Sequence, residues 1–248
     1  TNLIKILLSI ELIKEEEDER KNTILDIIEF EENKFCISCW DGTIKIMELY
    51  DNNKKYKIVQ ILPDHNNFVN CLKMLNFFKN EMVMASSSTG SIVILWKYEN
   101  DKFNKFREIK LNTNDDDPEI FSQIESLEES VKYQELIGGD FHRKKIFFCN
   151  LPEIKKYEAI DINVNRCIRA LKIIGNGEFL IVAGDEISIV KLENKSILMQ
   201  IKYDNCEFNC VFQKQNGNLL ITEYGNICKI REFRFNNEKL LLEDISIK

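Results

Sequence analysis

Short apolar segments alternate with polar breaks along the whole chain. A first group of three such segments covers residues 22–30, 35–40 and 41–46. The segments are rich in β-branched and aromatic residues, which is typical of β-strands, and turn-forming residues separate them. The spacing of apolar residues that an amphipathic helix requires is hard to find anywhere in the chain. The pattern therefore predicts an all-β fold.

The same three-strand unit returns several times. Further copies cover residues 68–94, 121–148, 167–190 and 208–230. A turn separates the second and third strands of each copy, at Gly42, Gly90, Asp140, Asp185 and Gly225. These turns are 48, 50, 45 and 40 residues apart, which fits the roughly 40–50 residues of a four-stranded propeller blade. Fourth strands are expected between copies and at the end of the chain, at residues 56–61, 106–111, 196–201 and 239–247.

The repeat predicts a β-propeller of four-stranded antiparallel blades, about five of them recognisable, in a single domain over residues 1–248. We expect all nine glycines to lie at hairpin turns, because tight hairpins need the positive φ that glycine adopts without steric cost. The three prolines are expected in connections, where a missing N–H breaks no ladder bond. Residues 112–130 are expected to be the longest irregular stretch.

Residues 36–46 resemble the second strand, the Asp-Gly turn (Asp41 and Gly42) and the third strand of a WD repeat. His65 matches the histidine that opens a blade in that family, and Trp96 lies close to the third-strand tryptophan. In the family these residues join a Ser or Thr and a turn Asp in a hydrogen-bonded chain within the blade. Two residues depart from the pattern, since Met47 stands near the tryptophan position and Thr89 replaces the turn Asp.

The resemblance implies a WD-repeat propeller with six or seven blades in the whole domain. Residues 1–13 are then expected to form the outer strand of a preceding or a closing blade. Residue 1 is not Met, so a segment of a longer chain is one interpretation of the sequence.

Composition restricts the partners. The chain has 248 residues, a net charge of −7 and a pI near 5.2, which argues against nucleic acid and against an anionic membrane surface. The apolar run at residues 3–13 is shorter than the roughly 20 residues that span a membrane and lacks the features of a signal peptide. Eight cysteines without a secretory signal indicate reduced thiols in a cytoplasmic, intracellular protein.

The candidates for chemistry are few. Cys36 and Cys39 form a Cys-x-x-Cys motif, but no second pair accompanies them, and residues three apart on a strand face opposite sides. Residues 175–177 are expected to be a hairpin turn, because the Lys-Ser/Thr of a phosphate-binding loop does not follow. His65 and His142 belong to no catalytic spacing. We therefore predict no catalytic residue, no cofactor and no metal site.

The resemblance points to one rim and the top face of the propeller as the partner-binding surface, because the turns between second and third strands and the entries to first strands gather there. On this rim we expect Trp40, Arg166, Glu223 and Tyr224, and Trp, Tyr and Arg are enriched at interface hot spots. For Trp40 the alternative is packing between adjacent blades. Asp41, Gly42, His65, Gly90, Trp96 and Gly225 are expected to be structural.

These observations predict a non-catalytic protein–protein interaction scaffold whose partner the sequence does not identify. One alternative is an architectural subunit of a cytoskeletal, ciliary or trafficking assembly, in which several surfaces would be covered at once. A propeller enzyme would need several Asp, Glu or His converging at strand ends, whereas the predicted innermost strands are chiefly apolar.

Overall fold

The computed structural model describes residues 23–51, 55–90, 92–111, 123–153, 157–161, 167–204, 206–225, 228–236 and 241–245. In these residues the chain forms twenty strands and no helix, so the all-β prediction is confirmed. The strands make five four-stranded sheets in which neighbours along the chain pair antiparallel. Contacts divide the chain into two compact units, Thr1–Lys110 and Leu111–Lys248.

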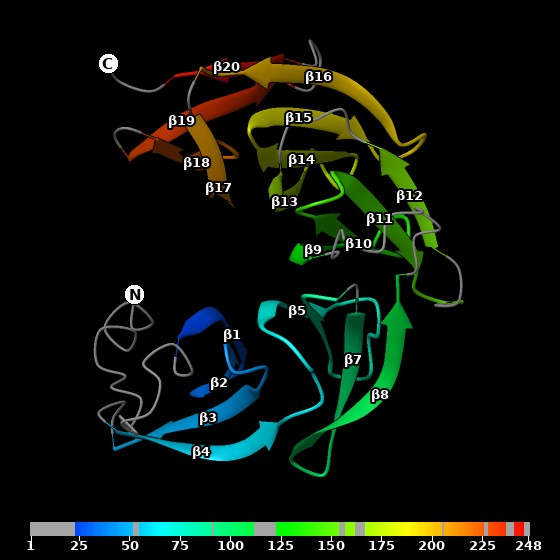
Figure 1. Ribbon diagram of the computed structural model, residues 1–248, viewed down its shortest axis with the longest axis vertical. Helices are drawn as coiled ribbons and strands as arrows, with labels where there is room; N and C mark the ends of the chain where they lie inside the picture. Colours follow the sequence, from blue (N-terminus) through cyan, green and yellow to red (C-terminus); the bar gives the residue numbers. More distant parts are fainter. Residues whose placement is uncertain are drawn as a thin grey trace. The chain divides into compact units, whose positions relative to one another are not determined.

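The first unit contains two sheets (Figure 1). Sheet 1 consists of β1 (Ile24–Glu31), β2 (Lys34–Cys39), β3 (Ile44–Tyr50) and β4 (Lys55–Leu62). Sheet 2 consists of β5 (Val69–Leu75), β6 (Val83–Ser88), β7 (Ile92–Glu99) and β8 (Lys102–Lys110). Strand β5 packs against β1 and β2. Between the sheets lies an apolar core that includes Ile46, Met84 and Trp96.

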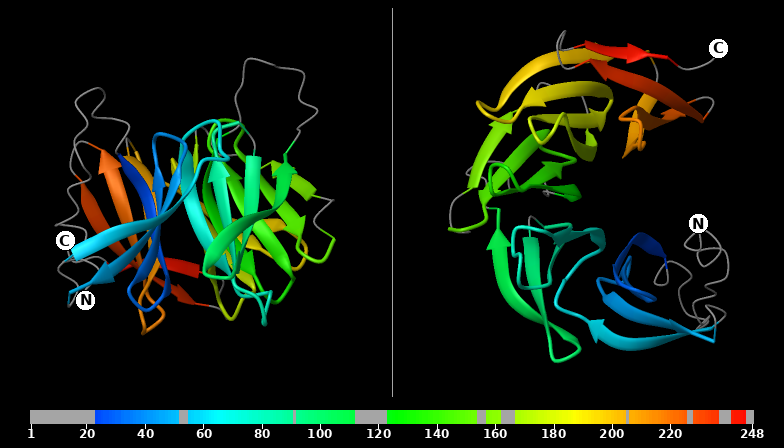
Figure 2. Two further views of the ribbon diagram at one scale, coloured as in Figure 1. Left: turned by 90° about the horizontal axis from the view of Figure 1, so that it is seen from below. Right: turned by 180° about the vertical axis from the view of Figure 1, so that it is seen from behind.

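The second unit contains three sheets, which Figure 2 shows in two further views. Sheet 3 consists of β9 (Ile124–Ser130), β10 (Glu135–Asp140), β11 (Lys145–Asn150) and β12 (Tyr157–Asp161). Sheet 4 consists of β13 (Ile168–Ile174), β14 (Phe179–Gly184), β15 (Glu186–Lys191) and β16 (Ser196–Lys202). Sheet 5 consists of β17 (Cys206–Gln213), β18 (Leu219–Gly225), β19 (Lys229–Asn236) and β20 (Leu241–Asp244).

Sheet 4 is covered on both faces. One side of β14 contributes Leu180 and Val182 to a core shared with sheet 3, and the other side contributes Ile181 to a core shared with sheet 5. This arrangement explains why β14 reads as a continuous apolar run rather than an alternating one. Each fully buried Leu, Ile or Val side chain stabilises the fold by about 1.5–3 kcal/mol relative to an exposed one.

In sheets 1 and 3, a residue beside the bulge of the first strand hydrogen-bonds to the neighbouring sheet. The Asp26 carboxylate of β1 accepts hydrogen bonds from the Ile27 N–H and, across the sheets, from the Leu72 N–H, both at 2.8 Å. In the second unit, Ser126 Oγ of β9 accepts from the Leu171 N–H of β13 at 3.0 Å. The same position thus satisfies a backbone donor of the next sheet in both units.

The structure corrects three expectations about secondary structure. Gly138 and Gly139 lie inside β10, and Gly184 and Gly225 are the last residues of β14 and β18, so these four glycines do not lie in turns. A Cβ at Gly139 would come within 2.6 Å of Ile168 Cγ2 in the adjacent sheet, which explains the glycine at that position. Part of the stretch expected to be irregular, Ile124–Ser130, is strand β9. The fourth strand β12 was not predicted. Residues 1–13, expected to be an outer strand, lie outside the described residues.

Candidate interaction surface

The turn between β2 and β3 is held rigidly by its own residues. Asp41 Oδ1 accepts hydrogen bonds from the Thr43 N–H at 2.9 Å and from Thr43 Oγ1 at 2.6 Å, and Asp41 Oδ2 lies 3.6 Å from Lys45 Nζ. Gly42 has φ +84°, and a Cβ there would approach the His65 carbonyl oxygen to 3.0 Å. Asp41 and Gly42 therefore fix the turn and bring it close to the backbone before β5.

Trp40 lies in this turn and stacks on Phe68, the residue that precedes β5. The two ring centroids are 3.7 Å apart at an interplanar angle of 22°. The backbone N–H of Trp40 also donates to the Thr23 carbonyl oxygen at 2.9 Å. Trp40 remains 36% exposed. Trp40 thus packs between sheets 1 and 2 and still presents aromatic surface to solvent.

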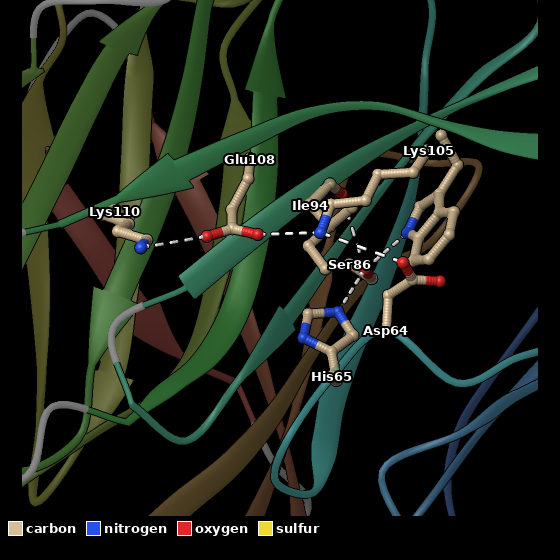
Figure 3. A network of polar contacts seen from close by, with 8 residues as sticks. Asp64, His65, Ser86, Ile94, Lys105, Glu108 and Lys110 are labelled. Atoms are coloured by element: carbon tan, nitrogen blue, oxygen red, sulfur yellow. Dashed lines mark hydrogen bonds and ion pairs between the residues drawn. The ribbon is translucent and has the colours of Figure 1, made fainter.

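Sheet 2 contains a buried hydrogen-bonded chain of His65, Ser86 and Trp96 (Figure 3). The Trp96 Nε1–H donates to Ser86 Oγ at 2.8 Å, and His65 Nε2 lies 2.7 Å from the same oxygen. The Ser86 hydroxyl donates to the Ile94 carbonyl oxygen at 3.4 Å. All three contacts are satisfied when Ser86 accepts from Trp96 and His65 and donates to Ile94. His65 and Trp96 are thus joined through Ser86 inside sheet 2.

The buried position of His65 disfavours its charged form. Desolvation, reinforced by the nearby positive charge of Lys105, lowers the pKa of His65 from 6.5 to about 4. Lys105 is itself paired with Glu108 at 2.8 Å and lies 3.9 Å from Asp64. His65 is therefore neutral near pH 7, and its Nδ1 is a buried atom without a hydrogen-bond partner.

We expect this histidine to make stability fall in mild acid. Its pKa is lower in the folded than in the unfolded state, so the unfolded chain takes up more protons as the pH falls from 6.5 towards 4. Between pH 7 and pH 5 this effect costs about 2 kcal/mol. In His65→Gln, which keeps a donor but does not titrate, urea unfolding should lose that part of the pH dependence. If the free energy of unfolding depended on pH equally in the parent chain and in His65→Gln, the lowered pKa of His65 would be contradicted.

Sheets 1 and 4 contain apolar pairs at the positions of Ser86 and Trp96. Counted from the first-strand bulge, the corresponding pair is Ile37 and Met47 in sheet 1. Ile37 and Met47 contact each other in one buried cluster. In sheet 4 the pair is Val182 and Val190, also in one cluster. Met47 therefore stands at the tryptophan position, as the sequence indicated.

The remaining predicted residues are distributed over the second unit and the turns. Glu223 lies inside β18 and not in a turn; it is buried, because the Arg231 Nε–H donates to its carboxylate. The structure thus places Glu223 in a strand, where the sequence predicted a turn. Tyr224 is 57% exposed, and Gly225 is the last residue of β18. Gly90 has φ +106°, as a tight turn requires. Arg166 lies outside the described residues.

One charged cluster was missed by sequence reasoning. Arg169 of β13 places Nη2 3.0 Å from Glu207 and Nη1 3.6 Å from Glu125, so it links sheets 3, 4 and 5. Its guanidinium lies 4.7 Å from the centre of the Phe141 ring. Burial raises the pKa of Glu125, against the opposing effect of Arg169. The charges hold the starts of three neighbouring sheets together.

Among the described residues no group of three or more His, Cys, Asp or Glu could hold a metal ion. Cys36 and Cys39 are both buried and belong to different core clusters, as expected for opposite faces of a strand. Burial raises the pKa of both thiols, and it raises the pKa of Cys149 to about 12. In the same described part of the chain there is no helix long and apolar enough to span a bilayer.

No protein-family model matches the sequence, and no curated protein matches it. Solved structures do share the fold. The WD40 β-propeller domain of Doa1 is 18% identical with a TM-score of 0.63, covering 85% of this chain and 63% of that one. The β-propeller domain of Cps50 (Swd1) from Myceliophteria thermophila is 16% identical with a TM-score of 0.67, covering 88% of this chain and 67% of that one.

These similarities define the class of fold. The five four-stranded antiparallel sheets fit the blades of a WD40 β-propeller. The chain spans about two thirds of the length of either solved domain.

Proposed function

We propose that the protein is a non-catalytic protein-interaction scaffold that binds partners through the rim formed by the β2–β3 turn and the start of β5. The observation that carries this proposal is the Trp40–Phe68 stack, which is partly exposed although both rings are held in place. A fixed aromatic side chain loses little conformational entropy when a partner covers it. Exposed Trp is also among the residues most enriched at binding hot spots.

The backbone of this rim supports the same proposal. The hydrogen bonds of Asp41 fix the turn, and the approach of Gly42 to the His65 carbonyl ties the turn to sheet 2. A surface that is preorganised in this way binds without a large ordering cost. The similarity to WD40 domains adds support at the level of the fold only. We propose that this acidic chain binds a protein partner in the cytoplasm.

Phage-displayed random peptides selected on the purified chain would test the proposal. For the selected peptides, we expect Trp40→Ala to weaken binding about 30-fold, corresponding to about 2 kcal/mol, in isothermal titration calorimetry. The matched control is Phe106→Ala, which removes another exposed aromatic ring in the same unit and should leave Kd within about twofold. Peptides whose binding is the same in Trp40→Ala and the parent chain would overturn the proposal. Circular dichroism would verify that both variants fold.

The second candidate function is an architectural subunit of a cytoskeletal, ciliary or trafficking assembly. Such a role needs several surfaces covered at once. A second exposed apolar surface, on sheet 5, favours it.

A further inference from the structure

Two turns of the second unit contain an Asn-Gly pair, and these are the two Asn-Gly sequences of the chain. Asn176 and Gly177 lie in the connection between β13 and β14. Asn216 and Gly217 lie in the connection between β17 and β18. Both asparagines are exposed to solvent, so exposure does not distinguish them.

An Asn-Gly pair can lose ammonia without an enzyme. The backbone nitrogen of the glycine attacks the side-chain carbonyl carbon of the asparagine and forms a C–N bond. The C–N bond of the carboxamide breaks, and its nitrogen leaves as ammonia with the proton of the attacking nitrogen. Water then opens the resulting five-membered succinimide at either carbonyl, which gives aspartate or isoaspartate. Glycine favours the attack because it has no Cβ that would hinder it.

The reacting atoms of the β17–β18 turn are held by hydrogen bonds. The Gly217 N–H donates to the Lys214 carbonyl oxygen at 2.9 Å. Asn216 Oδ1 accepts a hydrogen bond from the Asn218 N–H at 3.1 Å. Both the attacking nitrogen and the carboxamide under attack are therefore engaged, and both bonds must break before the succinimide forms.

The same atoms of the β13–β14 turn are not held in this way. Among the described residues, neither the Gly177 N–H nor the Asn176 carboxamide has a hydrogen-bond partner. The turn is closed by a bond from the Glu178 N–H to the Gly175 carbonyl oxygen, at 3.2 Å. Asn176 also has φ +56°, a left-handed conformation that is unfavourable for a residue with a Cβ. Rotation of Asn176 towards the attacking nitrogen therefore meets less resistance than rotation of Asn216.

We propose that Asn176 is a site of spontaneous deamidation in the folded protein and that Asn216 is protected from it. The product at position 176 carries one more negative charge. Asn176 and Gly177 line a cavity of about 470 Å³, and the described residues that line it carry no charge. The reaction thus places a carboxylate in the wall of this cavity, two residues from Glu178, which pairs with Lys132 at 2.9 Å.

Isoaspartate would also change the backbone, because it adds one atom to the main chain of the turn. Ile174 and Phe179 are cross-strand partners at the two ends of this turn, and both are buried in the core between sheets 4 and 5. The turn itself depends on positive φ at two successive residues, +56° and +84°. A longer main chain does not fit this geometry, so the modification loosens the hairpin that joins β13 to β14.

Ageing of the purified full chain at mildly alkaline pH tests the proposal. Peptide mapping by mass spectrometry follows the mass increase of about 1 Da that deamidation causes at each position. In the folded chain we expect position 176 to react about tenfold faster than position 216, because two hydrogen bonds oppose the reaction only at Asn216. In urea, where both turns are unfolded, the two rates should agree within about twofold.

Asn176→Gln is the matched control. It keeps the carboxamide but closes a six-membered ring, which forms far more slowly, so the change at position 176 should disappear while position 216 behaves as before. Circular dichroism would verify the fold. Equal rates at the two positions of the folded chain, or a faster rate at position 216, would overturn the proposal. A reaction at position 176 that occurs only in urea, or that does not accelerate as rising pH deprotonates the attacking nitrogen, would overturn it as well. The inference concerns the second unit and does not depend on the rim around Trp40.

Discussion

Replacing Ser86 by alanine should destabilise the protein by about 3 kcal/mol. The Ser86 hydroxyl is the shared acceptor of the Trp96 Nε1–H and of His65 Nε2 in a buried site. Its removal leaves two buried polar groups without a partner, and each such group costs about 1–3 kcal/mol. Urea unfolding followed by tryptophan fluorescence and circular dichroism would measure the loss.

Ser38 supplies a matched control for this experiment. It is a buried serine of β2, as Ser86 is of β6, but its Oγ has no hydrogen-bond partner. Ser38→Ala removes a buried hydroxyl that makes no hydrogen bond in the folded protein. We therefore expect the free energy of unfolding to change by less than about 0.5 kcal/mol or to rise. Equal losses in Ser86→Ala and Ser38→Ala would mean that the hydrogen-bonded chain contributes no stability.

Gly184→Ala should have an even larger effect, of about 4 kcal/mol or more. A Cβ at this position would lie 1.9 Å from the Cys167 carbonyl oxygen and 2.9 Å from its carbon. The obstacle is backbone at the start of β13, so no side-chain rotation relieves it. We expect a large fall in melting temperature or in the yield of folded protein, measured by differential scanning calorimetry and gel filtration.

Gly217→Ala separates this close approach from the effect of backbone conformation. Gly217 has φ +86°, but no atom lies within 4 Å of a Cβ built there. The cost should be only that of a left-handed alanine, about 1 kcal/mol. A loss as large as that of Gly184→Ala would show that space around the Cβ is not the decisive factor.

The strands and their repeat were predictable because both depend on local patterns. Strands β2 and β14 occupy the expected apolar segments, and the turn glycines Gly42 and Gly90 have the positive φ that tight turns need. Burial on both faces allowed β14 to be recognised as a continuous apolar run. The four-stranded antiparallel order then follows from short connections between consecutive strands.

Features that depend on the neighbouring sheet were not predictable. Gly139 is a glycine because Ile168 of the next sheet lies against it, and no property of β10 alone reveals this contact. Strand β9 was hidden by its carboxylates. Glu125 and Glu128 are compatible with a strand because Arg169 and Lys172 of the adjacent sheet pair with them.

Only some residues at and near the interaction surface were predictable from the sequence. The resemblance to WD repeats pointed to His65 and Trp96, whereas Ser86, which joins them, emerged only when the register of β6 was known. Phe68 was missed because its partner, Trp40, is 28 residues away in the chain. The burial of Glu223 depends on Arg231 across the β18–β19 pair, which local sequence does not specify.

Amide hydrogen exchange with a selected peptide bound is the most direct test of where partners bind. We expect the peptide to slow exchange in the β2–β3 turn around Trp40 and at Phe68, before β5. Slowing confined to the turns at the other strand ends of the first unit, β1–β2 and β5–β6, would contradict the assignment of the rim.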